Sequence, residues 1–254
     1  MPTLKENQDF WARYDWPERG DEWSVVWGGA ENQWWGTLYP RLRHLLPAGR
    51  LLEIAPGYGR FTAFLGDHCA ELIGVDLSER CVEACRGRFA DRPAMSFHVN
   101  DGVSLPMVED RSMDLVFSFD SLVHCEEEVL RSYVREIARV LGPDGVAFLH
   151  HSNLAAFRDP ASGLLTVGNP HWRAESMSAE RMRRFCAEAS VLCIGQELVN
   201  WGVDFLSDCF SLVTPAGSRR ARDPVVVENR EFMAEAERQA TIAGLYGVAP
   251  LRRS

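Results

Sequence analysis

The segment LLEIAPGYGR, residues 51–60, constrains the fold of this chain more than any other. A short apolar run that contains one acid, Glu53, ends in a turn with two glycines, Gly57 and Gly59. This pattern predicts a buried strand followed by a glycine turn and a helix. Open α/β sheets bind ligands beyond the carboxyl ends of their strands, and glycines let the backbone approach a ligand closely. The segment therefore predicts an α/β sheet with a ligand-binding turn after this strand.

Apolar runs and amphipathic segments alternate along the next hundred residues. A strong amphipathic helix is expected at residues 126–141, and the final two strands could pair as a hairpin. Such an order predicts a mostly parallel sheet with an antiparallel edge strand. Strands are expected at 51–55, 71–77, 95–101, 113–120 and 145–153, then in VLCIGQELVNWG and DCFSLVTPAG, with a terminal helix at 228–247.

Composition changes along the chain and suggests three regions. We expect an aromatic-rich N-terminal arm (1–44), a core domain (45–217) with an acceptor-binding insertion (154–177), and a C-terminal helical extension (218–254). The arm either closes one face of the core or covers a ligand as a lid, and both roles can coexist. It holds most of the tryptophans: Trp11, Trp16, Trp23, Trp27, Trp34 and Trp35.

Charge and cysteine usage limit the partners and the compartment. The net charge of −9 argues against a nucleic-acid partner. No apolar run is long enough to span a membrane, and the N-terminus lacks the pattern of a secretory signal. The seven cysteines lack zinc spacing, which predicts a reducing, cytoplasmic location and no metal. The sequence leaves the oligomeric state unknown.

Two further acids follow the next two expected strands. Asp76 ends the second strand in GVDLS, where a carboxylate can accept hydrogen bonds from both hydroxyls of a ribose. Asp101 ends the third in VNDG, where it can accept from the exocyclic amine of an adenine. Thr62 stands where a dinucleotide motif has its third glycine, and no Gly-Lys-Ser/Thr is present. The pattern therefore favours a nucleoside-like ligand over a pyrophosphate.

With these residues the chain resembles the class I S-adenosylmethionine-dependent methyltransferases over residues 45–217. The resemblance lies in EIAPGYG, GVDLS, NDG, DLVFSFDSLVH and LGPDG. It implies a Rossmann-like α/β fold with a seven-stranded sheet of order 3-2-1-4-5-7-6, strand seven antiparallel, and helices on both faces. It implies S-adenosylmethionine as the cofactor, with these residues at its site: Glu53, Ala55, Gly57, Gly59, Asp76, Leu77, Asp101, Gly102 and Phe119.

Methyl transfer to a hydroxyl requires removal of a proton, so a base is expected near the ends of the fourth and fifth strands. The candidates are His124 and His151, with Asp120 beside them. Only one of the adjacent pair His150 and His151 should face the site, because successive strand residues point to opposite faces. An unperturbed histidine base predicts a rate that rises through an ionisation near pH 6–7.

The acceptor is expected to be a small molecule, most simply a sugar hydroxyl. FDSLVH and HHSN resemble bacterial methyltransferases of saccharide and small-molecule pathways. A phenol or another natural product, or less readily an amine, is an alternative acceptor. A nicotinamide oxidoreductase and a non-catalytic cofactor-binding protein are the alternatives of another class. Residues expected to contact the acceptor are Asn153, His171, Trp172, Arg173 and Trp201.

Overall fold

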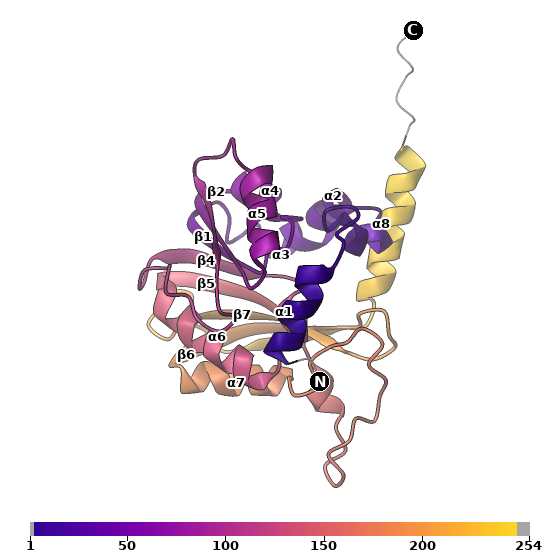
Figure 1. Ribbon diagram of the computed structural model, residues 1–254. Helices are drawn as coiled ribbons and strands as arrows, with labels where there is room; N and C mark the ends of the chain where they lie inside the picture. The colour runs from indigo at the N-terminus through magenta and orange to yellow at the C-terminus, as the bar shows by residue number, and fades with distance from the viewer. Residues whose placement is uncertain (1–2, 248–254) are drawn as a thin grey trace.

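A computed structural model describes residues 3–247, which form one mixed sheet with helices on both faces (Figure 1). The sheet has eight strands in the order β3-β2-β1-β4-β5-β7-β6-β8. Its strands are β1 (Ala48–Ile54), β2 (Cys69–Asp76), β3 (Met95–Val99), β4 (Met113–Ser118), β5 (Leu141–Ser152), β6 (Val191–Val199), β7 (Asp208–Pro215) and β8 (Val225–Asn229).

Strands β1 to β5 pair in parallel, and β7 is antiparallel to both β5 and β6. The predicted order of the first seven strands is confirmed, but the predicted number is wrong. The eighth strand, β8, adds to β6 in parallel. It lies in the region that we expected to be only helical, where the run Val225–Val227 has the β-branched residues that favour a strand. The terminal helix begins after it.

Serine side chains cap the first turn of two helices. Ser78 accepts a hydrogen bond from the Cys81 amide at the start of α5, and Ser178 does the same for Arg181 in α7. The α-helices are α1 (Leu4–Arg13), α2 (Ala30–Gln33), α3 (Tyr39–Leu42), α4 (Thr62–Gly66), α5 (Glu79–Arg88), α6 (Glu127–Val140), α7 (Ala179–Glu188) and α8 (Phe232–Tyr246). The chain also forms the 3₁₀-helices η1 (Asp21–Trp27), η3 (Leu122–His124) and η4 (Leu154–Phe157) and the π-helix η2 (Trp34–Leu38).

The sheet separates two hydrophobic cores. Helices α6 and α7 supply the core on one face, and α4, α5 and the second half of the N-terminal arm supply the core on the other. Trp27 and Trp34 are at most 1% exposed, and the Trp27 ring packs on Trp201 and Phe232. Residues 27–38 of the arm are therefore part of the fold itself.

The first half of the arm has a different position. Helix α1 lies in front of the sheet (Figure 1) and is held by polar contacts to its neighbours. The Asn7 amide donates to the His124 carbonyl at 2.9 Å, and Arg80 donates to the Tyr14 carbonyl at 2.9 Å. No helix within residues 3–247 is both long and apolar enough to cross a membrane.

Candidate functional site

A cavity of about 400 Å³ opens at the carboxyl ends of β1, β2 and β4. Helix α1 and the following residues to Trp23 form one of its walls, so this half of the arm covers the cavity. A volume of this size lies within the range of small-molecule sites. Most of the predicted site residues line it: Glu53, Ala55, Gly57, Asp76, Leu77, Gly102, Phe119, Asp120, His124, His171, Trp172, Arg173 and Trp201. Four do not: Gly59, Asp101, His151 and Asn153.

The glycine turn after β1 requires both of its glycines. Gly57 has φ +58° and Gly59 has φ +81°, a region that residues with a side chain rarely adopt. A Cβ on Gly57 would lie 2.7 Å from the Trp16 ring, and one on Gly59 would lie 2.6 Å from the Phe89 ring. Gly57 thus faces the cavity, whereas Gly59 lies against the core behind the turn.

Two buried carboxylates hold this turn. Asp76 accepts from the Gly57 amide at 3.1 Å and from the Ser78 amide at 2.8 Å, and burial raises its pKa to about 6. Glu53 accepts from the Thr62 hydroxyl at 2.7 Å, and burial raises its pKa to about 7. Each carboxylate oxygen has a second lone pair, so Asp76 can still accept from a ligand that donates two hydroxyls.

Asp101 lies outside the cavity lining. Its carboxylate accepts from the amides of Val103 and Ser104 at 2.9 and 2.7 Å, and from the Ser104 hydroxyl at 2.8 Å. A carboxylate has about four acceptor positions, so one more bond is available. The contact with an adenine amine stays a prediction. The next residue, Gly102, does line the cavity, and a Cβ there would lie 2.5 Å from Leu4 of α1.

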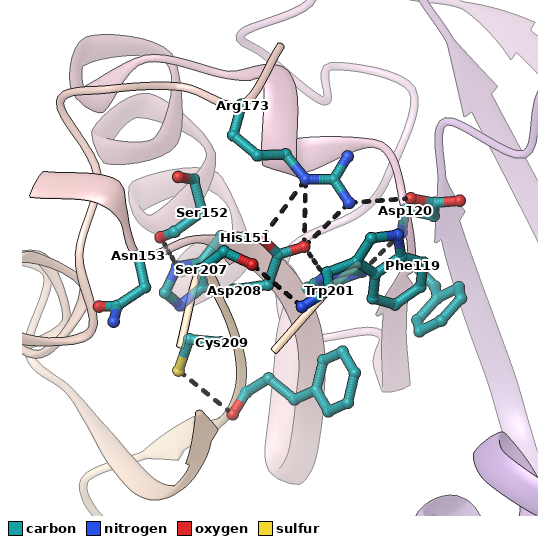
Figure 2. Close-up of polar contacts among 12 residues, drawn as sticks. Phe119, Asp120, His151, Ser152, Asn153, Arg173, Trp201, Ser207, Asp208 and Cys209 are labelled. Atoms are coloured by element: carbon teal, nitrogen blue, oxygen red, sulfur yellow. Dashed lines mark hydrogen bonds and ion pairs between the residues drawn. The ribbon is translucent and has the colours of Figure 1, made fainter. Parts of the chain in front are cut away.

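At the end of the cavity that Asp120 and Arg173 line, acidic and basic side chains pair with one another. Figure 2 shows Arg173 between Asp208 and Asp120. Its guanidinium lies 2.9 Å from the Asp208 carboxylate and 3.7 Å from that of Asp120. Asp120 also accepts from Arg60 at 3.0 Å. Burial alone would raise the pKa of Asp208, but Arg173 and His150 bring it down to about 2. Sequence reasoning missed Asp208 and Arg60, because nothing in their local sequence distinguishes them from ordinary charged residues.

The adjacent histidines of β5 face opposite sides of the sheet, as alternation requires. His150 lies behind the cavity wall, where Nδ1 accepts from the Asp120 amide at 3.0 Å and Nε2 donates to Asp208 at 2.9 Å. His151 is fully buried and bonds the Ser152 carbonyl and the Ser211 hydroxyl. The expectation that His151 faces the site is therefore wrong, since the register of β5 turns His150 toward it.

Asn153 is likewise a structural residue. Its amide nitrogen donates to the Leu206 carbonyl, and its oxygen accepts from the Ala179 amide at the start of α7, both at 2.9 Å. Both ends of the side chain are thus occupied within the protein. The structure places it away from the cavity, against the expectation of an acceptor contact.

His124 is buried in the cavity wall between two tryptophans. Its ring lies 5.6 Å from that of Trp11 and 5.7 Å from that of Trp172. The Trp172 carbonyl, 2.9 Å from Nδ1, is only an acceptor, so Nδ1 carries the proton and Nε2 keeps a lone pair that no donor within residues 3–247 occupies. Burial first, and then the charge of Arg173, lowers the pKa of His124 to about 4. The expected ionisation near pH 6–7 is thus corrected downward.

Aromatic rings from the arm and the insertion continue this wall. Trp11 contacts Trp16 and Trp23, and Phe10 contacts Trp172 with ring centroids 5.3 Å apart. All five residues line the cavity. A wall of this composition presents flat, polarisable surfaces to a ligand. The sequence showed the tryptophans but could not tell which of them face a ligand and which pack in the core.

Unusual backbone conformations concentrate around the cavity. Of the seven non-glycine residues with positive φ in the described chain, four line it. Such conformations cost free energy and cluster at functional sites, where the surrounding structure enforces them. The four are Trp16, Ala55, Asp120 and Trp172. Within residues 3–247, no group of three or more His, Cys, Asp or Glu side chains could hold a metal ion.

Comparisons with known proteins agree with this geometry. Residues 52–149 match the model of the methyltransferase domain family. A probable S-adenosylmethionine-dependent methyltransferase of Mycolicibacterium smegmatis is 29% identical over 60% of this chain, a match that spans 58% of the relative's own length.

Solved structures share the fold at low identity. The PH0226 protein of Pyrococcus horikoshii superposes with a TM-score of 0.57 at 21% identity, over 73% of this chain and 90% of that one. The N-methyltransferase NodS of Bradyrhizobium japonicum superposes with a TM-score of 0.54 at 16% identity, over 70% and 94%. The match to the methyltransferase domain family and to the Mycolicibacterium smegmatis relative implies S-adenosylmethionine as the cofactor. The positive-φ glycine turn and the buried acceptor Asp76 fit such a ligand.

Proposed function

We propose that this chain, a class I S-adenosylmethionine-dependent methyltransferase by its domain match and fold, methylates a hydroxyl of a small molecule with a flat ring. The observation that carries the proposal is His124, which lies in an aromatic cavity wall and whose Nε2 has no partner in the described part of the chain. The cofactor supplies a methyl group on a positively charged sulfur. The protein must then orient the acceptor, exclude water and remove its proton.

The state of His124 supports its assignment as the base. Its Nδ1–H donates to the Trp172 carbonyl, which fixes the ring and leaves Nε2 as the atom that can take a proton. With a pKa of about 4 the imidazole is neutral throughout the physiological range. The rate should therefore stay level between about pH 6 and 8 as far as this base is concerned.

Asp120 is less suited to act as a base. Arg60 and Arg173 neutralise its carboxylate, which lies 3.0 and 3.7 Å from their guanidinium groups. We assign it to orientation of ligand groups at this end of the cavity. The His150 ring accepts from its backbone amide and so supports its positive-φ conformation.

The acceptor is better matched by a phenol than by a sugar. A base of pKa about 4 is weak, and a phenol of pKa about 10 gives up its proton more readily than an aliphatic hydroxyl, which is close to water at about 15.7. A sugar also needs several free polar side chains. Arg173 is paired with Asp208, Asn153 bonds within the protein, and Trp201 is only 9% exposed.

A product assay tests the proposal. The protein is incubated with methyl-labelled S-adenosylmethionine and a panel of simple phenols, free sugars and primary amines, and the products are identified by mass spectrometry. We expect methylated phenols. Methylation of sugars or amines alone, or of nothing while the cofactor binds, would contradict the acceptor or the activity respectively.

The base is tested by His124→Gln, because glutamine can still donate to the Trp172 carbonyl. We expect kcat to fall by roughly 10²–10⁴, with unchanged affinity for S-adenosylhomocysteine. The matched control is His44→Gln, the same change at an exposed histidine outside the cavity lining. A near-wild-type rate in His124→Gln would remove this residue from the mechanism.

A further inference from the structure

Two cavity-lining residues on the first half of the N-terminal arm each carry a polar atom that lacks a hydrogen-bond partner in the described chain. Among the described residues, no group bonds the indole Nε1 of Trp16 or the amide Oδ1 of Asn7, although both atoms are shielded from solvent. Both residues line the cavity. A buried polar atom without a partner is costly, so its retention at a ligand cavity needs an explanation.

Trp16 lies on the glycine turn. Its ring stacks on that of Tyr58, with centroids 4.8 Å apart and planes 11° apart, and its edge contacts the position of the Gly57 Cβ. The backbone of Trp16 adopts a left-handed conformation, with φ +48°. Indole Nε1 can only donate a hydrogen bond. Arg60 lines the same cavity, but its guanidinium pairs with Asp120 at 3.0 Å, so the indole N–H is the donor on this part of the wall that can still bond an anionic group.

Asn7 lies farther along the same wall. Its Nδ2 donates to the His124 carbonyl at 2.9 Å, which fixes the amide so that Oδ1 is the atom left over. The side chain is 6% exposed. One turn earlier, Leu4 lies against Gly102, in the loop after β3, and Leu77, which directly follows β2, lies beside the same glycine. An oxygen here requires a ligand group that donates.

We infer that the N-terminal arm binds the cofactor directly, with Trp16 donating to its amino-acid carboxylate and Asn7 accepting from its nucleoside. The carboxylate is the anionic group of S-adenosylmethionine, and the nucleoside carries its hydroxyl and amine donors. The inference rests on the proposed use of this cofactor. It makes residues 4–16 part of the cofactor site rather than a cover for the acceptor alone.

A binding assay with two ligands distinguishes the Trp16 contact from the Asn7 contact and requires no methyl transfer. S-adenosylhomocysteine carries the amino-acid carboxylate, whereas 5′-methylthioadenosine keeps the nucleoside and lacks that carboxylate. Titration calorimetry measures both against Trp16→Phe, which keeps a ring and removes the N–H. We expect affinity for S-adenosylhomocysteine to fall about 10-fold or more and affinity for 5′-methylthioadenosine to change less than about 2-fold.

Asn7→Ala should weaken both ligands alike, by about 3-fold to 10-fold. The matched controls are Trp34→Phe and Gln33→Ala. These residues also carry buried side-chain nitrogens without a partner in the described chain, but they lie outside the cavity lining. Both controls should bind as the wild type does. Melting temperatures show that each variant is folded.

The indole resonance of Trp16 gives a second readout in the unaltered protein. With ¹⁵N-labelled tryptophan, its N–H signal should shift on addition of S-adenosylhomocysteine and stay in place with 5′-methylthioadenosine. Equal losses for both ligands in Trp16→Phe, or an unmoved indole signal, would overturn the inference. Intact cofactor binding without any methylated product would instead contradict the proposed function and leave this binding result standing.

Discussion

The burial of His124 has a consequence for stability that can be measured without a substrate. Its pKa falls from 6.5 to about 4 on folding, because burial and then Arg173 disfavour the charged ring. Between these values the unfolded chain binds a proton that the folded protein does not. Stability contributed by the neutral ring is therefore complete above pH 6.5 and is lost as the pH falls toward 4.

The magnitude follows from the size of the shift. One pKa unit corresponds to about 1.4 kcal/mol, so the complete effect is about 3 kcal/mol. Between pH 7.5 and 5.0, a pKa change from 6.5 to about 4 removes about 2 kcal/mol from the free energy of unfolding. Glu53 and Asp76 act in the opposite direction, because burial raises their pKa values to about 7 and 6.

Comparison with His124→Gln isolates the histidine, since the other groups are common to both proteins. Urea unfolding at pH 7.5 and 5.0 gives four free energies. We expect the wild type to lose about 2 kcal/mol more than the variant over this interval.

His44→Gln, the same change at an exposed site, should follow the wild type at both pH values. A differential below about 0.5 kcal/mol for His124→Gln would refute the reasoning that burial holds this ring neutral.

Three further predictions concern other parts of the site. Deletion of residues 1–19 should preserve a cooperative melting transition in calorimetry but abolish methyl transfer in the product assay. Deletion of residues 1–35 should unfold the protein, because it also removes the core residues Trp27 and Trp34, and a calorimetric scan checks this. Asp76→Ala should weaken cofactor binding by about 1.5–3 kcal/mol in calorimetry, and unchanged affinity would exclude Asp76 from the site. Asp208→Asn should lower the free energy of unfolding by about 3 kcal/mol, since it leaves Arg173 buried without its full partner, and a loss under about 1 kcal/mol would argue against that role.

The first seven strands and the glycine turn at the cofactor end of the cavity were predictable because their signals are local, and the order of those strands followed from the resemblance to class I methyltransferases. A strand that ends in a glycine turn carries its own conformational requirement, and Gly57 and Gly59 do adopt positive φ. The strand β8 was missed because five residues between longer elements give a weak signal. Its pairing with β6 depends on residues thirty positions earlier in the chain, as in the pair Gly195 and Val225.

The arrangement of residues at the acceptor end of the cavity could not be predicted, because it depends on contacts between segments far apart in the sequence. The choice between His150 and His151 follows from the register of β5, which no local pattern reveals. Asp208 becomes important only because β7 brings it against Arg173 and His150. The neutral state of His124 likewise arises from burial against rings of the arm and the insertion and from the charge of Arg173.

The sequence by itself determined the class of fold, the glycine turn and the acids that follow neighbouring strands. Only the tertiary structure decided which tryptophans form the core, which cover the cavity, and which histidine has a free nitrogen there. The physical reason is that backbone conformation is set largely by neighbouring residues, whereas burial, pairing and protonation are set by groups that folding brings together from far along the chain.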